Sequence, residues 1–155
     1  MHGILLLLSA CVALSGCTRN NGDIGRWFGT WQLEEITVDG EVDADYGRNI
    51  FWKFQNDIIC MVKVDSSDGM NRYEQVWGTW EERDNNLFLD FTYSDFENTS
   101  WSGYASNGLY VPFPVTRIPY GEISRLEIVS DNSKKLTLRY VGNSGMVCGY
   151  VLRKQ

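Results

Sequence analysis

Apolar and polar residues alternate with a period of two along most of the chain from Trp27 onward. This alternation is typical of β-strands that bury one face, and it lacks the longer period of an amphipathic helix. In residues 50–55, for example, Ile50, Trp52 and Phe54 share one face. The pattern predicts eight strands, centred on residues 31–38, 50–55, 58–64, 73–80, 87–91, 123–129, 136–140 and 148–152.

Short polar turns connect most of these strands. Residues 56–57, 84–86, 131–133 and 142–145 separate neighbouring apolar runs, as in antiparallel hairpins. The alternation slips by one residue at Glu34-Glu35, which predicts a β-bulge in the first strand. Because closure removes exposed sheet edges, we expect an all-β fold, an eight-stranded antiparallel up-and-down barrel. An open sandwich is the alternative.

Residues 94–121 interrupt the regular succession of strands and turns. This stretch contains all three prolines of the chain. Long loops in compact domains are commonly functional, and the aromatic content argues against disorder. We expect this loop either to fold over the mouth of the barrel as a lid or to pack against its outer wall. The candidate lid residues are six aromatics, Phe96, Trp101, Tyr104, Tyr110, Phe113 and Tyr120.

The first sixteen residues (MHGILLLLSACVALSG) form a short apolar stretch without Lys, Arg, Asp or Glu. The run is shorter than the roughly 20 residues of a membrane-spanning helix and ends in small residues, as export signals do. The last three residues of this stretch and the residue that follows it, Leu14-Ser15-Gly16-Cys17, resemble the lipobox of bacterial lipoproteins. The resemblance implies a signal peptide over residues 1–16, acylation of Cys17 with palmitate-type chains, a lipidated tether over 17–26 and a folded domain over 27–155.

Acylation implies both a location and a partner. Several acyl chains on one cysteine hold a protein to a bilayer, because each buried methylene contributes about 0.8 kcal/mol. Position 18 is Thr rather than the Asp of the inner-membrane retention signal of lipoproteins. We therefore expect a lipid-anchored protein of the bacterial cell envelope, at the outer membrane.

Two G-x-W triplets occur in the chain, one at the start of the first predicted strand and one at the end of the predicted strand 73–80. Gly29-Thr30-Trp31 opens the first strand, and Gly78-Thr79-Trp80 precedes a hairpin that continues through Leu87 and Leu89. With the final Tyr150, Leu152, Arg153 and Lys154, this pattern is similar to the small lipocalin-like domains on lipoproteins of Bacteroides-type bacteria. The resemblance implies that Trp31 plugs the closed end of a barrel, with Arg139 or Arg153 covering its ring.

Charge and histidine content exclude several function classes. The formal net charge of −6 lies entirely after residue 16 and argues against nucleic-acid binding, which needs a basic patch. The single histidine, His2, lies in the predicted signal peptide. A chain without histidine lacks the usual Ser-His-Asp and Cys-His sites and the usual His-ligated metal sites. We expect no cofactor and no bound metal.

Carboxylates supply the other candidate chemistry. Glu34-Glu35 and Glu81-Glu82 are adjacent pairs, so one member of each pair could face the barrel interior. Two facing carboxylates can hydrolyse glycosides, but solvent-exposed strand positions are the simpler interpretation. Asp39, Glu41, Asp43 and Asp45 alternate along one segment without the glycine spacing of a calcium-binding EF-hand loop, which favours a solvated acidic loop.

Two cysteines remain in the folded domain, Cys60 and Cys148. Both lie within predicted strands that are far apart in strand order. An exported protein can form a disulfide, but buried cysteines also serve as small apolar core residues, and we favour two free thiols.

Aromatic residues are the remaining candidates for binding. Those on the predicted inner face either line an apolar pocket for a small ligand or fill the core. We expect a non-enzymatic protein that binds a small apolar ligand or an envelope protein at the barrel mouth. The alternative is a structural or inhibitory interaction module with a filled barrel and an aromatic outer wall at Phe51, Trp77 and Phe88. The ligand-binding candidates are Trp31, Trp52, Phe54, Trp80, Phe91 and Tyr150.

Overall fold

The computed structural model describes residues 25–67, 69–92, 113–119 and 121–155. The predicted signal peptide, Cys17 and the lid candidates Phe96, Trp101, Tyr104, Tyr110 and Tyr120 lie outside these residues. The described elements are β1 (Gly29–Val38), β2 (Glu41–Val42), β3 (Ile50–Gln55), β4 (Ile58–Ser67), β5 (Met70–Arg83), β6 (Asn86–Asp90), the short 3₁₀ helix η2 (Pro114–Thr116), β7 (Ile123–Asp131), β8 (Lys135–Val141) and β9 (Val147–Lys154).

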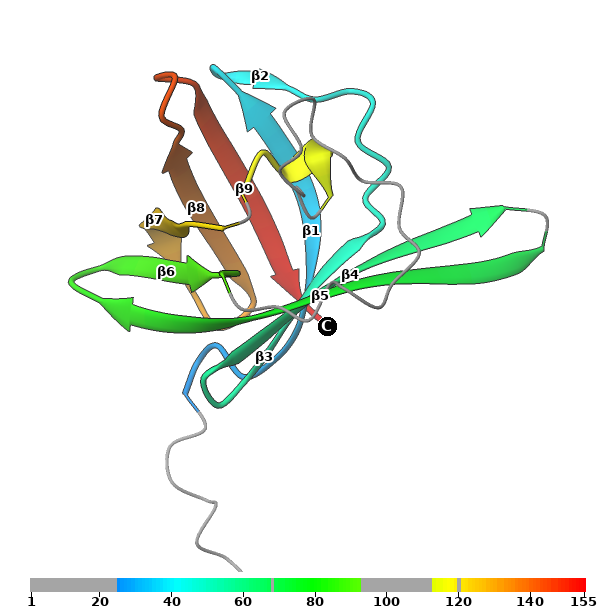
Figure 1. The fold of residues 1–155 in the computed structure, drawn as a ribbon, viewed down its shortest axis with the longest axis horizontal. Coiled ribbons are helices and arrows are strands. Elements are labelled where there is room, and N and C mark those ends of the chain that lie inside the picture. The colour runs from blue at the N-terminus through cyan, green and yellow to red at the C-terminus, as the bar shows by residue number, and fades with distance from the viewer. Residues whose placement is uncertain (1–24, 68, 93–112, 120) are drawn as a thin grey trace, which may run out of the picture.

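The long strands form one closed antiparallel barrel (Figure 1). Each strand from β3 to β9 pairs with its neighbour in sequence, and β1 pairs with β3 on one side and with β9 on the other. This arrangement confirms the predicted eight-stranded all-β barrel. The two-residue strand β2 is an addition to that prediction: Asp39-Gly40 turns the chain so that Val38 pairs with Glu41. The acidic segment therefore begins as a hairpin and not as a loop.

Local sequence accounts for the turns and bends. Asp84 and Asn85 both have positive φ, as a two-residue type I′ hairpin turn requires, and Asn and Asp tolerate that conformation. The register shifts between Leu33 and Glu35, which confirms the predicted bulge. A second shift, between Ile128 and Ser130, had no counterpart in the predicted pattern.

The hairpin of β4 and β5 is longer than predicted and projects from the barrel as a two-stranded ribbon (Figure 1). The extra pairs include Asp65 with Arg72 and Ser66 with Asn71. These polar residues carry no apolar alternation, so the sequence pattern could not extend the strands over them.

The inner faces of the strands meet in one apolar core. Trp31, Trp52, Phe54, Phe91 and Tyr150 are each at most 1% exposed. In the second G-x-W triplet, a methyl group on Gly78 would lie 2.4 Å from the carbonyl oxygen of Asp90 and 2.5 Å from Cδ1 of Phe91. The glycine is therefore needed where the Phe91 ring packs directly against the backbone of β5.

Candidate functional site

The predicted inner-face aromatics form a contiguous cluster inside the barrel. The ring centroids of Trp52 and Tyr150 are 5.8 Å apart, and those of Trp52 and Phe54 are 6.4 Å apart. Trp80 meets Phe54 edge-on at 5.1 Å but is only partly buried. The interior of this barrel is thus lined and largely occupied by aromatic rings.

The N-terminal segment plugs one end of the barrel, which we call the closed end. Trp27, which the strand pattern did not assign to the core, is buried, and its ring packs at a tilt 5.3 Å from Phe54 and 5.7 Å from Trp80. Its indole N–H donates to Glu82 at 2.5 Å, and its carbonyl oxygen accepts the indole N–H of Trp31 at 2.8 Å. The buried indole donors of Trp27 and Trp31 are therefore satisfied.

Cations complete the closed end. Arg26 pairs with Glu82 on β5 and with Asp131 on β7, so one side chain connects two strands. The ring of Trp31 is covered by Lys154, whose Nζ lies 5.3 Å from the ring centroid and donates to the carbonyl of Arg26 at 3.0 Å. The expectation that Arg139 or Arg153 covers Trp31 is wrong. Those two arginines face outward on their strands and pair with glutamates, Arg139 with Glu127 and Arg153 with Glu34.

Residues 113–118 lie at the other end of the interior, which we call the covered end. Phe113, Thr116 and Ile118 are buried, and Phe113 and Ile118 belong to the same core cluster as the barrel aromatics. The Tyr150 hydroxyl, from β9, donates to the Thr116 carbonyl at 2.5 Å, and burial raises the pKa of Tyr150. The described part of the predicted lid loop therefore covers the interior, with η2 next to β1 and β9 (Figure 1).

A second buried tyrosine ties the β2–β3 connection to the barrel wall. The hydroxyl of Tyr46 donates to the carbonyl of Leu33 at 2.7 Å and accepts from the backbone N–H of Ile50 at 3.3 Å. Burial raises the pKa of Tyr46, so this residue acts as a neutral hydrogen-bonding group. No alternation in the sequence signals this role, because Tyr46 lies between strands.

Three buried polar groups lack a hydrogen-bond partner among the described residues: the indole N–H groups of Trp52 and Trp80 and the hydroxyl of Ser124. The two indoles lie in the aromatic cluster. Trp52 is fully buried, and the aromatic neighbours described above are Phe54 and Tyr150. Because an unpaired buried N–H is costly, these donors are the groups in the interior that a ligand oxygen could engage.

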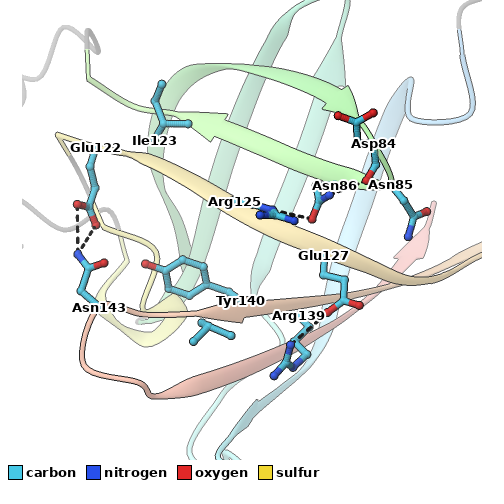
Figure 2. Close-up of a pocket in the computed structure, with 11 residues that line it drawn as sticks. Asp84, Asn85, Asn86, Glu122, Ile123, Arg125, Glu127, Arg139, Tyr140 and Asn143 are labelled. Carbon is cyan, nitrogen blue, oxygen red and sulfur yellow. Dashed lines mark hydrogen bonds and ion pairs between the residues drawn. The ribbon is translucent and has the colours of Figure 1, made fainter.

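The outer face of β6, β7 and β8 carries a pocket of about 510 Å³ (Figure 2). Residues of three strands meet there because Asn86 pairs with Glu127 and Glu127 pairs with Arg139. Arg125 lies at the centre of Figure 2, between the Glu122–Asn143 contact on one side and the Glu127–Arg139 pair on the other. The sequence analysis missed this pocket, since it depends on the register of three strands.

The candidate carboxylates do not converge in the interior, and Glu34, Glu81, Glu82 and Asp43 each pair with an arginine. Arg153 donates to Glu34 at 2.6 Å, and this hydrogen bond holds the pKa of Glu34 below its usual value. Glu82 belongs to the closed end, as described above. In the acidic segment, Asp43 pairs with Arg117 at 3.6 Å. Within the described ranges, no group of three or more His, Cys, Asp and Glu side chains is arranged to hold a metal ion.

The cysteines and outer-wall aromatics are placed as follows. Cys60 and Cys148 are free and buried, in agreement with the favoured interpretation, and burial raises the pKa of Cys60 to about 11. On the outer wall, Trp77 is 51% exposed, whereas Phe88 lies under the guanidinium of Arg83 at 4.6 Å. Phe51 is partly buried.

None of the helices in the described ranges has the length and apolar character to cross a membrane.

Comparisons with known proteins agree with this geometry. Residues 12–142 match the family model of the lipocalin-like domain. An uncharacterized protein from Bacteroides eggerthii has a similar structure, with a TM-score of 0.56, 22% identity, and coverage of 83% of this chain and 99% of that one. A lipocalin-like protein from Bacteroides uniformis matches with a TM-score of 0.59, 16% identity, and coverage of 84% and 100%. The search of curated proteins returned no match.

Proposed function

The chain belongs to the lipocalin-like domain family, and from this premise we propose that it is a non-enzymatic binding protein of the bacterial cell envelope. Its ligand is a small apolar molecule with one hydrogen-bond acceptor, held inside the barrel. An acyl group on Cys17 anchors the protein to the outer membrane. The ligand enters at the covered end, because the closed end is plugged by Trp27 and its ion pairs.

The unpaired indole N–H of Trp52 is the observation that carries this proposal. A buried donor without an acceptor costs about 1–3 kcal/mol, and a carbonyl or ether oxygen of a bound molecule would remove that cost. The surrounding rings of Phe54 and Tyr150 offer apolar faces for the rest of such a molecule. One polar group within an apolar surround is the usual composition of a small-molecule site.

Entry requires residues 113–118 to move away from the interior. The described contacts that hold this segment include the Tyr150–Thr116 hydrogen bond and the Arg117–Asp43 ion pair, the latter partly exposed. The helix η2 is only three residues long. A short segment outside the strand ladders can open locally at a lower free energy than the strands it covers.

Ligand binding is tested with the neutral, apolar fluorophore 6-propionyl-2-dimethylaminonaphthalene, whose carbonyl is a hydrogen-bond acceptor. The protein used in this experiment is the fragment 18–155, which contains every described residue and lacks Cys17. We expect saturable binding with a blue-shifted emission. Trp52→Phe keeps an aromatic ring and removes the N–H, so it should weaken binding about 3- to 10-fold, as expected for one lost hydrogen bond. Trp77→Phe, on the outer wall, is the matched control and should bind like the wild type. Failure of the wild type to bind this and related carbonyl probes contradicts the interior site.

Anchoring is tested separately in cells. Metabolic labelling with an alkyne-tagged fatty acid should mark the wild-type chain and not Cys17→Ala, which should leave the membrane fraction. If Cys17→Ala remains membrane-bound without detergent, the acyl anchor is wrong, whatever the outcome of the ligand experiment.

The exposed apolar side chains of the β4–β5 hairpin favour a second candidate, protein interaction through the outer wall. Tyr73 is 57% exposed and Trp77 51%, and Ile58 on β4 is 42% exposed. Cys60 pairs with Trp77 and Val64 with Tyr73, so the two exposed aromatics lie on the same face of the ribbon. Loss of binding to an envelope protein in Tyr73→Ala and Trp77→Ala, with probe binding unchanged, would favour this candidate.

A further inference from the structure

The pocket on the outer face of β6, β7 and β8 is separate from the proposed interior site, and nothing in the family assignment gives it a role. Its charged strand residues face away from the core, since Arg125 and Glu127 alternate along β7 with the buried Ser124 and Leu126. Tyr140 is the exception in the lining, because it is buried and belongs to the core cluster. The volume of about 510 Å³ lies within the roughly 300–1,000 Å³ of small-molecule sites.

Most side chains that line this pocket end in a planar polar group. Eight of its eleven residues, all except Ile123, Tyr140 and Val141, carry a carboxylate, a carboxamide or a guanidinium group. Each of these groups is planar and offers two neighbouring hydrogen-bonding atoms at a fixed spacing. Such a lining suits a ligand with hydrogen-bonding groups on adjacent atoms, and the three remaining side chains provide an apolar edge.

The charges in the pocket alternate in sign. Along the wall, Glu122 lies beside Asn143, Arg125 follows, and the Glu127–Arg139 pair comes next (Figure 2). A carboxylate ligand only accepts hydrogen bonds and would be repelled by the glutamates, while an ammonium ligand only donates and would be repelled by the arginines. A hydroxyl can accept from a guanidinium and donate to a carboxylate at the same time. The alternation therefore favours a neutral polyol over a ligand of either charge.

Arg125 is fixed in place while its end remains available. Its Nε donates to the side-chain Oδ1 of Asn86 at 2.9 Å, and Nδ2 of Asn86 donates to the backbone carbonyl of Asp84 at 2.6 Å. Asn86 is only 7% exposed, so it is a rigid support. In the part of the chain that the structure describes, no carboxylate pairs with Arg125, in contrast to Arg139. The two terminal nitrogens of Arg125 are thus free of a charged partner, with their direction set in advance.

We infer that this outer-wall pocket binds a neutral saccharide, with Arg125 donating to a pair of neighbouring hydroxyls and the flanking glutamates accepting from others. The inference does not rest on the interior ligand site or on the acyl anchor. It gives the protein a second binding surface, on the side of the barrel wall.

The experiment screens the full chain, kept soluble in a detergent without a sugar headgroup, on an array of neutral and acidic glycans. The best neutral saccharide is then titrated by isothermal titration calorimetry. We expect Arg125→Ala to weaken binding at least 10-fold and Asn143→Ala, at the rim, about 3-fold. Arg72→Ala, on the projecting ribbon, removes the same charge and should bind like the wild type. Affinity for a neutral ligand should change less than 2-fold between about 0.05 and 0.5 M NaCl.

Three outcomes overturn the inference: no neutral saccharide binds, only acidic glycans bind and salt weakens them, or binding survives Arg125→Ala. Unchanged circular dichroism and melting temperature in Arg125→Ala show that a loss of binding is not a loss of folding. The fluorescent carbonyl probe, titrated with the same variants, should bind equally to all of them. Failure at the outer wall and failure in the interior are therefore read separately.

Discussion

The two ends of the barrel are built differently. At the closed end, the indole donors of Trp27 and Trp31 have acceptors, Arg26 connects β5 to β7, and Lys154 covers the ring of Trp31. At the covered end, a short segment around η2 is held by the Tyr150–Thr116 hydrogen bond, an ion pair and buried side chains. One end is made of strand termini joined across the barrel, and the other is a separate piece of chain laid over the interior.

The difference teaches where this fold can open. Separating the closed end would expose Trp27 and Trp31 together and break ion pairs to two strands. Lifting residues 113–118 breaks the Tyr150–Thr116 hydrogen bond and the Arg117–Asp43 ion pair and leaves every strand pair intact. Local opening is therefore expected at the covered end, at a free energy below that of global unfolding.

The largest test of this contrast is Trp31→Ala. Removing a fully buried indole leaves a large cavity, and we expect the free energy of unfolding to fall by about 3–5 kcal/mol in a urea titration. Trp77→Ala is the matched control on the exposed outer wall and should cost less than about 1 kcal/mol. If Phe113→Ala at the covered end costs as much as Trp31→Ala, the two ends do not differ as described.

Gly78→Ala tests the wall between the two ends. The new methyl group would lie 2.4 Å from the Asp90 carbonyl oxygen, so β5 or β6 must shift, at a cost of about 1–3 kcal/mol. Because the wall serves both ends, hydrogen exchange should accelerate at both. Gly142→Ala, where the nearest atom is 3.7 Å away, is the control. A melting temperature equal to that of the control would show that the Phe91 contact is not tight.

Tyr150→Phe sharpens the contrast at the covered end alone. The substitution removes one buried donor and should cost about 0.5–1.5 kcal/mol. The amides of Thr116 and Arg117, which bond within the segment to Phe113 and Pro114, should exchange about tenfold faster. Tyr46→Phe also removes a buried tyrosine hydroxyl and should leave these two amides unchanged. Equal acceleration in both variants would mean that the segment does not open independently.

The smallest effect concerns pH and the Glu34–Arg153 pair on the wall near the closed end. Its hydrogen bond lowers the pKa of Glu34 below 4.5, so the pair stabilises the fold above that pH and the contribution is lost as the pH falls through the folded-state pKa. Glu34→Gln should lower the melting temperature by about 1 °C at pH 7 and by less at pH 3. The difference at pH 7 should shrink in 1 M NaCl. A larger difference at pH 3 than at pH 7 would reverse the assigned sign.

Alternation alone predicted the strands and most of the core. It located eight strands and the Glu34 bulge, and it assigned Trp31, Trp52 and Tyr150 to the interior. It missed Trp27, which precedes the first strand and is buried by a turn and not by alternation. The sequence pattern could have identified the cation that covers Trp31. Lys154 has the same phase on β9 as Leu152 and Tyr150, whereas Arg153 has the opposite phase.

The candidate sites were less predictable, because they depend on which strands become neighbours. The sequence pattern identified Trp52 and Trp80 as aromatic residues that could contact a ligand. Whether their indole N–H groups find acceptors depends on how the interior is packed. The outer-wall pocket joins Asn86, Arg125 and Arg139 through the register of three strands. No local pattern in the sequence fixes that register. The buried support of Arg125 by Asn86 depends on it as well.

Pairing of β1 with β9 brings the two ends of the described chain together. Lys154 contacts the backbone of Arg26, and the N–H of Gln155 donates to the carbonyl of Thr30. A peptide linker could therefore join these ends and new termini could be opened in the turn at residues 142–145, since circular permutation is tolerated where the termini are adjacent. In such a permutant both termini would lie at the covered end, beside the turn at Asp39-Gly40, and the closed end would carry no chain terminus.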